Sequence, residues 1–259
     1  MIEQQHTDQA VEKSTAGVPI INITDLEKSF GSQKVLDGVS FQLNKEENLV
    51  ILGKSGSGKS VLIKCIAGLL KPDNGKVLVL GESIPDLNKK ELNELRKKIG
   101  FLFQSSALYD SMNVKDNLEF PLLRIRHDLT KKQRMEKIEE ALNGVGLSDA
   151  LYKMPSQLSG GMRKRIGLAR TLIIDPQIML YDEPTTGLDP VTSEEISLLI
   201  NDIQKKYKTS SIIITHDLLC ARITADRLIL LKEGKVFATG SFDELKNSTD
   251  TLINSFFKT

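Results

Sequence analysis

Cysteine is scarce in this chain, which has only Cys65 and Cys220 among its 259 residues. Two cysteines in helix-like contexts cannot form the disulfide framework of a small secreted domain, and they favour a reducing, cytoplasmic compartment. The net charge is also small, at +1, with neither a broad basic field nor an acidic tail. We therefore expect no nucleic-acid partner, and we interpret the local basic clusters as solvated surface.

Long apolar runs are absent as well. No stretch approaches the ~18 apolar residues that a membrane-spanning helix needs. Residues 1–18 are polar and lack the apolar core of a secretory signal, so we expect them to form a loose N-terminal tail. If the protein works at a membrane, another chain must provide the membrane span.

The chain does contain short apolar runs that alternate with helical patterns, and its 40% hydrophobic and 27% charged residues suit a large α/β domain. Continuous apolar runs are typical of strands buried on both faces of a sheet. Such runs cover residues 49–52, 99–103, 178–181 and 212–215. Other expected strands cover 20–30 and 35–43, which we take as antiparallel, and 76–80, 228–231 and 236–238.

Residues 105–158 carry no strand run, which predicts a helical subdomain inserted into the sheet-based core. With the helix that follows, from 161 to about 174, this subdomain covers about 105–175. We place the main domain at 19–246 and a helical extension at 247–259. Capping boxes that begin at Asn88, Thr130 and Ser241 indicate further helix starts.

The string GKSGSGKS follows an apolar strand and precedes a helix expected over 59–70, and it matches G-x-x-x-x-G-K-[ST]. Its glycines let backbone N–H groups surround phosphate oxygens, and the helix start adds a partial positive charge. Lys59 is expected to reach the β- and γ-phosphates, and Ser60 to offer its hydroxyl to Mg²⁺. The alternative is a ligand-free turn. The loop comprises Gly53, Lys54, Ser55, Gly56, Ser57, Gly58, Lys59 and Ser60.

Polar residues end several of the buried strands, at the edge of the sheet where ligands bind in open α/β folds. Asp182 could hold Mg²⁺, and Glu183 could orient and polarise an attacking water. His216 could contact the γ-phosphate, and Gln104 could complete the Mg²⁺ shell. The alternatives are a solvated acidic pair that caps a strand, a structural histidine at a strand end, and a polar strand terminator at Gln104.

A third motif, LSGG, precedes the helix expected from 161. Ser159 can cap that helix, while Gly160 and Gly161 expose backbone N–H groups, which together make an anion site. No strand brings this site to the phosphate loop of its own chain. A simple capped helix is the alternative.

These motifs together resemble the ATP-binding-cassette (ABC) ATPases over nearly the whole chain. The resemblance implies an α/β P-loop fold with a mainly parallel core sheet, an antiparallel β subdomain and an inserted helical subdomain. It also implies a homodimer in which LSGG of one protomer binds the γ-phosphate held by the other. Its cofactors would be ATP and Mg²⁺.

The same resemblance assigns roles to single residues. Glu183 would be the catalytic base, assisted by Lys59 and His216. Ser60, Gln104 and Asp182 would hold the metal. Asp189 would lie in the D-loop and can also cap the following helix, and Phe30 would stack on adenine. For Phe30, packing in the core is the alternative.

Three further segments, 103–114, 117–122 and 161–165, resemble the lipid-transport ATPases of the Mla, or toluene-tolerance, type. Those proteins pair with a membrane permease and an MCE-family lipid-binding protein in Gram-negative envelopes. The resemblance places this subunit on the inner face of the cytoplasmic membrane. Ala107, Leu108 and Tyr109 would line the groove for the permease's coupling helix, with ordinary core packing as the alternative.

Competing functions stay open at this point. The core motifs do not distinguish a phospholipid transporter from an importer of polar solutes or amino acids. A cell-division regulator is also a single cassette bound to a membrane partner. A P-loop kinase of small molecules would leave LSGG unexplained.

Overall fold

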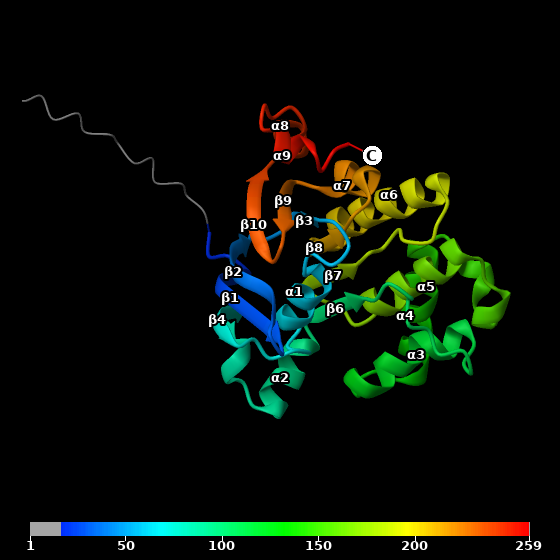
Figure 1. Ribbon diagram of the computed structural model, residues 1–259. Coiled ribbons are helices and arrows are strands. Elements are labelled where there is room, and N and C mark those ends of the chain that lie inside the picture. Colours follow the sequence, from blue (N-terminus) through cyan, green and yellow to red (C-terminus); the bar gives the residue numbers. More distant parts are fainter. Residues whose placement is uncertain (1–16, 259) are drawn as a thin grey trace, which may run out of the picture.

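Two β-sheets and the helices around them make up the computed structural model, which describes residues 17–258 (Figure 1). The expected tail over 1–18 lies almost wholly outside the described residues. Among residues 17–258, no helix is both long and apolar enough to cross a membrane.

The larger sheet has six strands in the order β10-β9-β3-β8-β7-β6. All neighbours pair in parallel except β10, which pairs antiparallel with β9. Every residue of the central strands β3, β7 and β8 is buried, as their apolar runs predict. The strands are β3 (Asn48–Leu52), β6 (Ile99–Leu102), β7 (Ile178–Asp182), β8 (Ser210–Thr215), β9 (Arg227–Lys232) and β10 (Lys235–Gly240).

The smaller sheet has four strands in the order β2-β1-β4-β5, and each pair is antiparallel. The antiparallel pairing expected for the first two strands is therefore confirmed. The strands are β1 (Ile21–Phe30), β2 (Gln33–Leu43), β4 (Asn74–Val79) and β5 (Glu82–Ser83). In Figure 1 this sheet lies on the opposite side of the core from the helices α3, α4 and α5.

The helices begin where the capping residues predict. Asn88, Thr130 and Ser241 each form a complete capping box at the start of α2, α4 and α8. The helices are α1 (Lys59–Ile66), α2 (Lys89–Arg96), α3 (Val114–Ile125), α4 (Lys131–Gly144), α5 (Gly160–Leu172), α6 (Pro190–Tyr207), α7 (Leu218–Thr224), α8 (Phe242–Lys246) and α9 (Thr251–Asn254). Short 3₁₀ turns cover Ile84–Asp86, Ser148–Ala150 and Pro155–Gln157.

Helix α1 is shorter than the expected 59–70. It ends at Ile66 because Gly68 adopts a left-handed backbone, with φ of 65°. The next two amides, of Leu69 and Leu70, then donate to the carbonyl of Lys64. A glycine in this conformation commonly ends a helix. The apolar residues on both sides of Gly68 favour a continuing helix in the sequence, so the end is not evident there.

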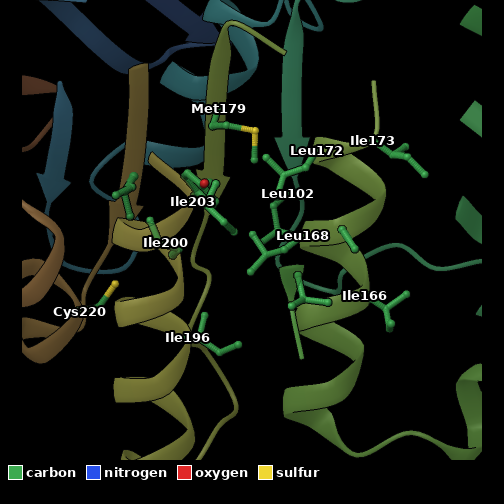
Figure 2. Close-up of a cluster of buried hydrophobic side chains, with 14 of the residues drawn as sticks. Leu102, Ile166, Leu168, Leu172, Ile173, Met179, Ile196, Ile200, Ile203 and Cys220 are labelled. Atoms are coloured by element: carbon green, nitrogen blue, oxygen red, sulfur yellow. The ribbon is translucent and has the colours of Figure 1, made fainter. Parts of the chain in front are cut away.

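The core sheet separates two hydrophobic clusters, and successive residues of β3 enter them alternately. Val50 and Leu52 belong to the cluster that packs against α3–α7, whereas Leu49 and Ile51 face α1 and the smaller sheet. Figure 2 shows part of the first cluster, with side chains of α5, α6, β6 and β7 gathered where these elements meet. This packing sets α5 and α6 at fixed positions relative to the strand ends that carry the polar residues.

Candidate functional site

The loop from β3 to α1 has a backbone that only glycine accommodates easily. Gly56 and Gly58 have φ of 81° and 102°. A Cβ atom at Gly58 would lie 2.8 Å from the carbonyl oxygen of Val35. At Gly53 it would lie 2.5 Å from Oγ of Ser57, a buried hydroxyl for which residues 17–258 provide no hydrogen-bond partner. The glycine pattern of the sequence is therefore required by the shape of this loop.

The loop borders a hollow of about 340 Å³ at the carboxyl edge of the core sheet. The hollow brings together residues from β2, α1 and the ends of β6, β7 and β8. Its lining consists of Val35, Ser55, Gly56, Gly58, Lys59, Ser60, Val61, Gln104, Glu183 and His216. Sequence reasoning missed Val35 and Val61; only the hairpin of β1 and β2 beside the loop could have indicated Val35.

Other candidate residues lie beside this hollow. Gly53, Lys54 and Ser57 line two adjacent hollows on the side of Phe256. Phe30 is 49% exposed at the end of β1 and is not part of the lining, so its contact with adenine stays a prediction.

Lys59 is buried, and its ammonium group is directed at the inner side of the loop. Nζ donates to the carbonyl oxygens of Gly53 and Lys54, at 2.7 and 3.2 Å. It also lies 3.4 Å from Oε1 of Glu183. The cation is therefore held between the phosphate loop and the end of β7.

Glu183 directly follows β7 and has a left-handed backbone, with φ of 51°. Its amide donates to the carbonyl of Ile214, which attaches it to β8. Its Oε2 lies 2.8 Å from Nδ1 of His216 and accepts a hydrogen bond from Thr186 Oγ1 at 3.3 Å. One carboxylate thus joins a lysine and a histidine from different elements, which is an arrangement that can orient water and stabilise charge.

Ser60 and Asp182 provide oxygen atoms suited to a hard cation. Ser60 Oγ donates to Asp182 Oδ1 at 3.2 Å. Burial raises the pKa of the Asp182 carboxyl above its ordinary value, and the hydrogen bond from Ser60 opposes that effect. Asp182 and Gln104 also share the lining of an open hollow of about 490 Å³. Carboxylate, hydroxyl and amide oxygens are ligands that Mg²⁺ accepts.

Ser159 and Asp189 both begin helices, and neither lines the hollow. Ser159 Oγ accepts from the amide of Met162 at 3.2 Å, and Asp189 Oδ1 accepts from Thr192 at 3.0 Å. A Cβ atom at Gly161 would lie 2.6 Å from Thr192 Cγ2, so α5 and α6 begin in contact. The structure therefore does not bring Ser159, Gly160 and Gly161 to the phosphate loop of the same chain.

A second concave region, the aromatic groove, lies on α3, α5 and the segment after β6. It has a volume of about 280 Å³. The rings of Phe101 and Phe103 stack at 4.2 Å, and those of Tyr109 and Phe120 lie 5.1 Å apart. The complete lining is Ile99, Gly100, Phe101, Phe103, Ala107, Tyr109, Phe120, Pro121, Arg170, Thr171 and Ile174.

For Leu108, the structure shows the alternative that the sequence left open, which is packing in the core. Ala107 and Tyr109 line the aromatic groove, but Leu108 packs against the core cluster instead. Ser106 and Ala107 have φ of 61° and 45°, so the chain does not continue as a strand, and Leu108 turns inward.

Comparison with known proteins agrees with this geometry. The family profile described as ABC transporter matches residues 36–186. The probable ribonucleotide transport ATP-binding protein mkl of Mycobacterium tuberculosis is 41% identical over 249 residues, which are 94% of this chain and 68% of that protein.

Two other relatives carry different names. Protein TRIGALACTOSYLDIACYLGLYCEROL 3, chloroplastic, of Arabidopsis thaliana is 39% identical over 92% of this chain and 73% of its own length. The methionine import ATP-binding protein MetN of Rhizobium johnstonii is 37% identical over 90% of this chain and 64% of its own length.

A solved structure also matches, that of the dimeric ATP-binding cassette MJ0796 in a post-hydrolysis state bound to ADP and Pi. It is 32% identical, with a TM-score of 0.78 over 86% of this chain and 98% of that chain. The glycine-containing loop and the buried ammonium of Lys59 fit the phosphates of ATP. The oxygen atoms of Ser60 and Asp182 fit Mg²⁺. The chain therefore belongs to the ABC transporter family, as an ATP-binding cassette that hydrolyses ATP with Mg²⁺.

Proposed function

We propose that this cassette is the energising subunit of a transporter that moves phospholipid between the membranes of a Gram-negative envelope. The observation that carries the energising role is the convergence of Lys59, Glu183 and His216 on one hollow. The lipid substrate is supported by segments 103–114, 117–122 and 161–165. It is further supported by the relative named after trigalactosyldiacylglycerol, a glycerolipid.

In the proposed reaction, the P-loop residues 53–60 hold the phosphates of ATP. Glu183 orients a water molecule and accepts its proton as the water oxygen bonds to the γ-phosphorus and the bond to ADP breaks. His216 holds the Glu183 carboxylate in place, and Lys59 stabilises charge on the transferred group. Ser60, Gln104 and Asp182 would hold Mg²⁺, which would neutralise charge on the phosphate oxygens. Phe30 stacks on the adenine.

The proposed working unit is a homodimer. Ser159, Gly160 and Gly161 form the start of α5, outside the lining of the hollow of their own chain. This helix start and Asp189 would complete the nucleotide site of the second copy, so that ATP closes the dimer.

The aromatic groove is the proposed docking place for the permease. Phe103 and Tyr109 are 37% and 45% exposed, and the groove adjoins Gln104 at the nucleotide site. Exposed aromatic rings are typical anchors of protein interfaces. A helix of the permease in this groove would move together with the segment after β6 that contains Gln104, here called the Gln104 loop. The proposed location is the inner face of the cytoplasmic membrane, with an MCE-domain lipid-binding protein as a further partner.

The test is reconstitution of the cassette with its permease in vesicles that contain labelled phospholipid. We expect ATP-dependent phospholipid movement that the Glu183→Gln complex does not support. Movement of methionine without phospholipid would contradict the lipid proposal and favour an amino-acid importer, as the similarity to MetN allows. Detergent co-purification of a multi-span permease would support transport over a regulatory role.

A further inference from the structure

Lys164 is a buried cation that the proposed reaction does not use. It lies on α5, one turn after the helix start at Ser159, and it is only 4% exposed. Burying an ammonium group is costly unless its donors are satisfied. Burial lowers the pKa of Lys164 to about 8, although the nearby Asp182 and Glu183 favour the charged form.

The acceptors of Lys164 are two backbone carbonyls. Nζ donates to the carbonyl oxygen of Gln104 in a close hydrogen bond and to that of Glu183 at 3.3 Å. These residues follow the neighbouring parallel strands β6 and β7. Both of their side chains line the nucleotide hollow. Lys164 therefore connects the ends of two strands that carry functional side chains.

Other residues of α5 contact the segment that follows Gln104. A Cβ atom at Gly167 would lie 3.0 Å from Ser106 Cβ, so the helix contacts the loop directly. Farther along, Arg170 donates to the carbonyls of Ser106 and Ala107, at 3.0 and 2.8 Å. One face of α5 thus fixes successive carbonyls after Gln104.

The hydrogen bond from Lys164 to the carbonyl of Glu183 helps to hold an unusual backbone conformation. This left-handed conformation is unfavourable for a residue with a side chain, and surrounding contacts must maintain it. The amide bond to Ile214 fixes one side of the residue, and Lys164 fixes its carbonyl on the other. These two restraints set the direction in which the side chain leaves the backbone, and His216 and Lys59 then orient the carboxylate.

We infer that Lys164 is a positioning residue of the ATPase, which holds the backbones of Gln104 and Glu183 so that their side chains face one nucleotide. It also links them to the helix that begins at Ser159. A rotation of α5 would then shift the water-orienting carboxylate and the Gln104 loop together. This inference rests on the ATPase roles proposed above for Gln104 and Glu183.

The test compares Lys164→Met, Lys164→Gln and Lys164→Arg in the full chain with its permease. We expect Lys164→Met to lower kcat by about tenfold to a hundredfold, because small displacements of reacting groups have effects of this size. The Kd for ATP, measured without Mg²⁺, should change less than twofold. Lys164→Arg should recover part of kcat, since a guanidinium can also donate to two carbonyls.

Lys137→Met is the matched control, because the Lys137 ammonium pairs with Asp175 on the surface of the same helical region, at 2.8 Å. It should keep the kcat of the unaltered protein. A Lys164→Met protein with unchanged kcat would overturn the inference, and so would a failure of all three Lys164 variants to fold. Near-normal turnover of Glu183→Gln would instead refute the proposed catalytic base, so the two failures are distinguishable.

Discussion

Nδ1 of His216 lies 2.8 Å from Oε2 of Glu183, and this contact joins the ends of β8 and β7. The other carboxylate oxygen, Oε1, lies 3.4 Å from the ammonium of Lys59. Both oxygens of Glu183 are therefore oriented by side chains from other elements. A carboxylate held in this way points in a defined direction and can orient a water molecule in the hollow.

Replacing Glu183 by Gln should remove the proton acceptor while preserving its shape. Loss of a general base lowers rates by roughly 10²–10⁴-fold, and we expect kcat for ATP to fall within that range. The Kd for ATP should stay close to that of the unaltered protein, because the phosphate loop is unchanged. Phosphate release and nucleotide binding, measured on the same preparation, check the two statements. Substantial turnover by the variant would exclude Glu183 as the base.

Tyr109→Ala tests the aromatic groove as the docking place of the permease. The variant removes a 45% exposed ring that contacts Phe120, and we expect weaker co-purification of the permease. Tyr152→Ala is the control, since Tyr152 is 71% exposed and lies outside the groove. Quantitative pull-down from detergent extracts measures both. Equal loss in the two variants, or loss in neither, would contradict the assignment.

The two thiols should be almost inert in the folded protein. Burial raises the pKa of Cys65 to about 11 and that of Cys220 to about 12. At pH 8 their thiolate populations, and hence their alkylation rates, should be about a hundredfold or more below those of a free thiol. Mass spectrometry after iodoacetamide treatment checks this, with guanidinium-unfolded protein as the control. Rapid labelling of the native protein would contradict the burial.

The same shifts give a pH dependence of stability. Each thiol has a higher pKa in the folded than in the unfolded state, so its contribution is complete below the unfolded value of 9.0. The contribution is lost as the pH rises from there through about 11. The free energy of unfolding, measured in urea at a series of pH values, should therefore fall as the pH rises from 9.0 through about 11, and a constant value over this range would contradict the burial of the thiols.

Local sequence rules explain why so much of the fold was predictable. The strand before Gly53, the loop and the helix after Gly58 follow from glycine positions and apolar runs alone. The capping boxes at Asn88, Thr130 and Ser241 each depend on residues three positions apart. Such signals need no knowledge of the tertiary structure.

Residues whose environment depends on distant segments were not predictable. Lys164 has the sequence context of a charged residue on a helix, yet its acceptors lie 60 and 19 positions away. Val35 reaches the hollow only because β2 passes the phosphate loop. No sequence signature marks the left-handed conformations of Ser106 and Ala107, so the inward turn of Leu108 does not follow from the sequence.

Gly100→Ala tests how closely β6 packs against the helical side of the core. A Cβ atom there would lie 2.6 Å from both Met179 Sδ and Thr171 Cγ2. The thioether can move, but Thr171 is fixed, since its hydroxyl donates to the carbonyl of Gly167 at 2.7 Å. Overpacking of this kind costs about 1–3 kcal/mol, and we expect the free energy of unfolding to fall by that amount.

Gly144→Ala is the matched control because a Cβ atom there meets nothing closer than Tyr207 Oη, at 3.5 Å. Gly144 is the last residue of α4, where alanine is the better helix former by up to about 1 kcal/mol. Urea unfolding of both variants should therefore give changes of opposite sign. If Gly100→Ala had the same free energy of unfolding as the unaltered protein, β6 would lie farther from Thr171 of α5 than the 2.6 Å contact implies. That result would contradict a close contact between α5 and β6.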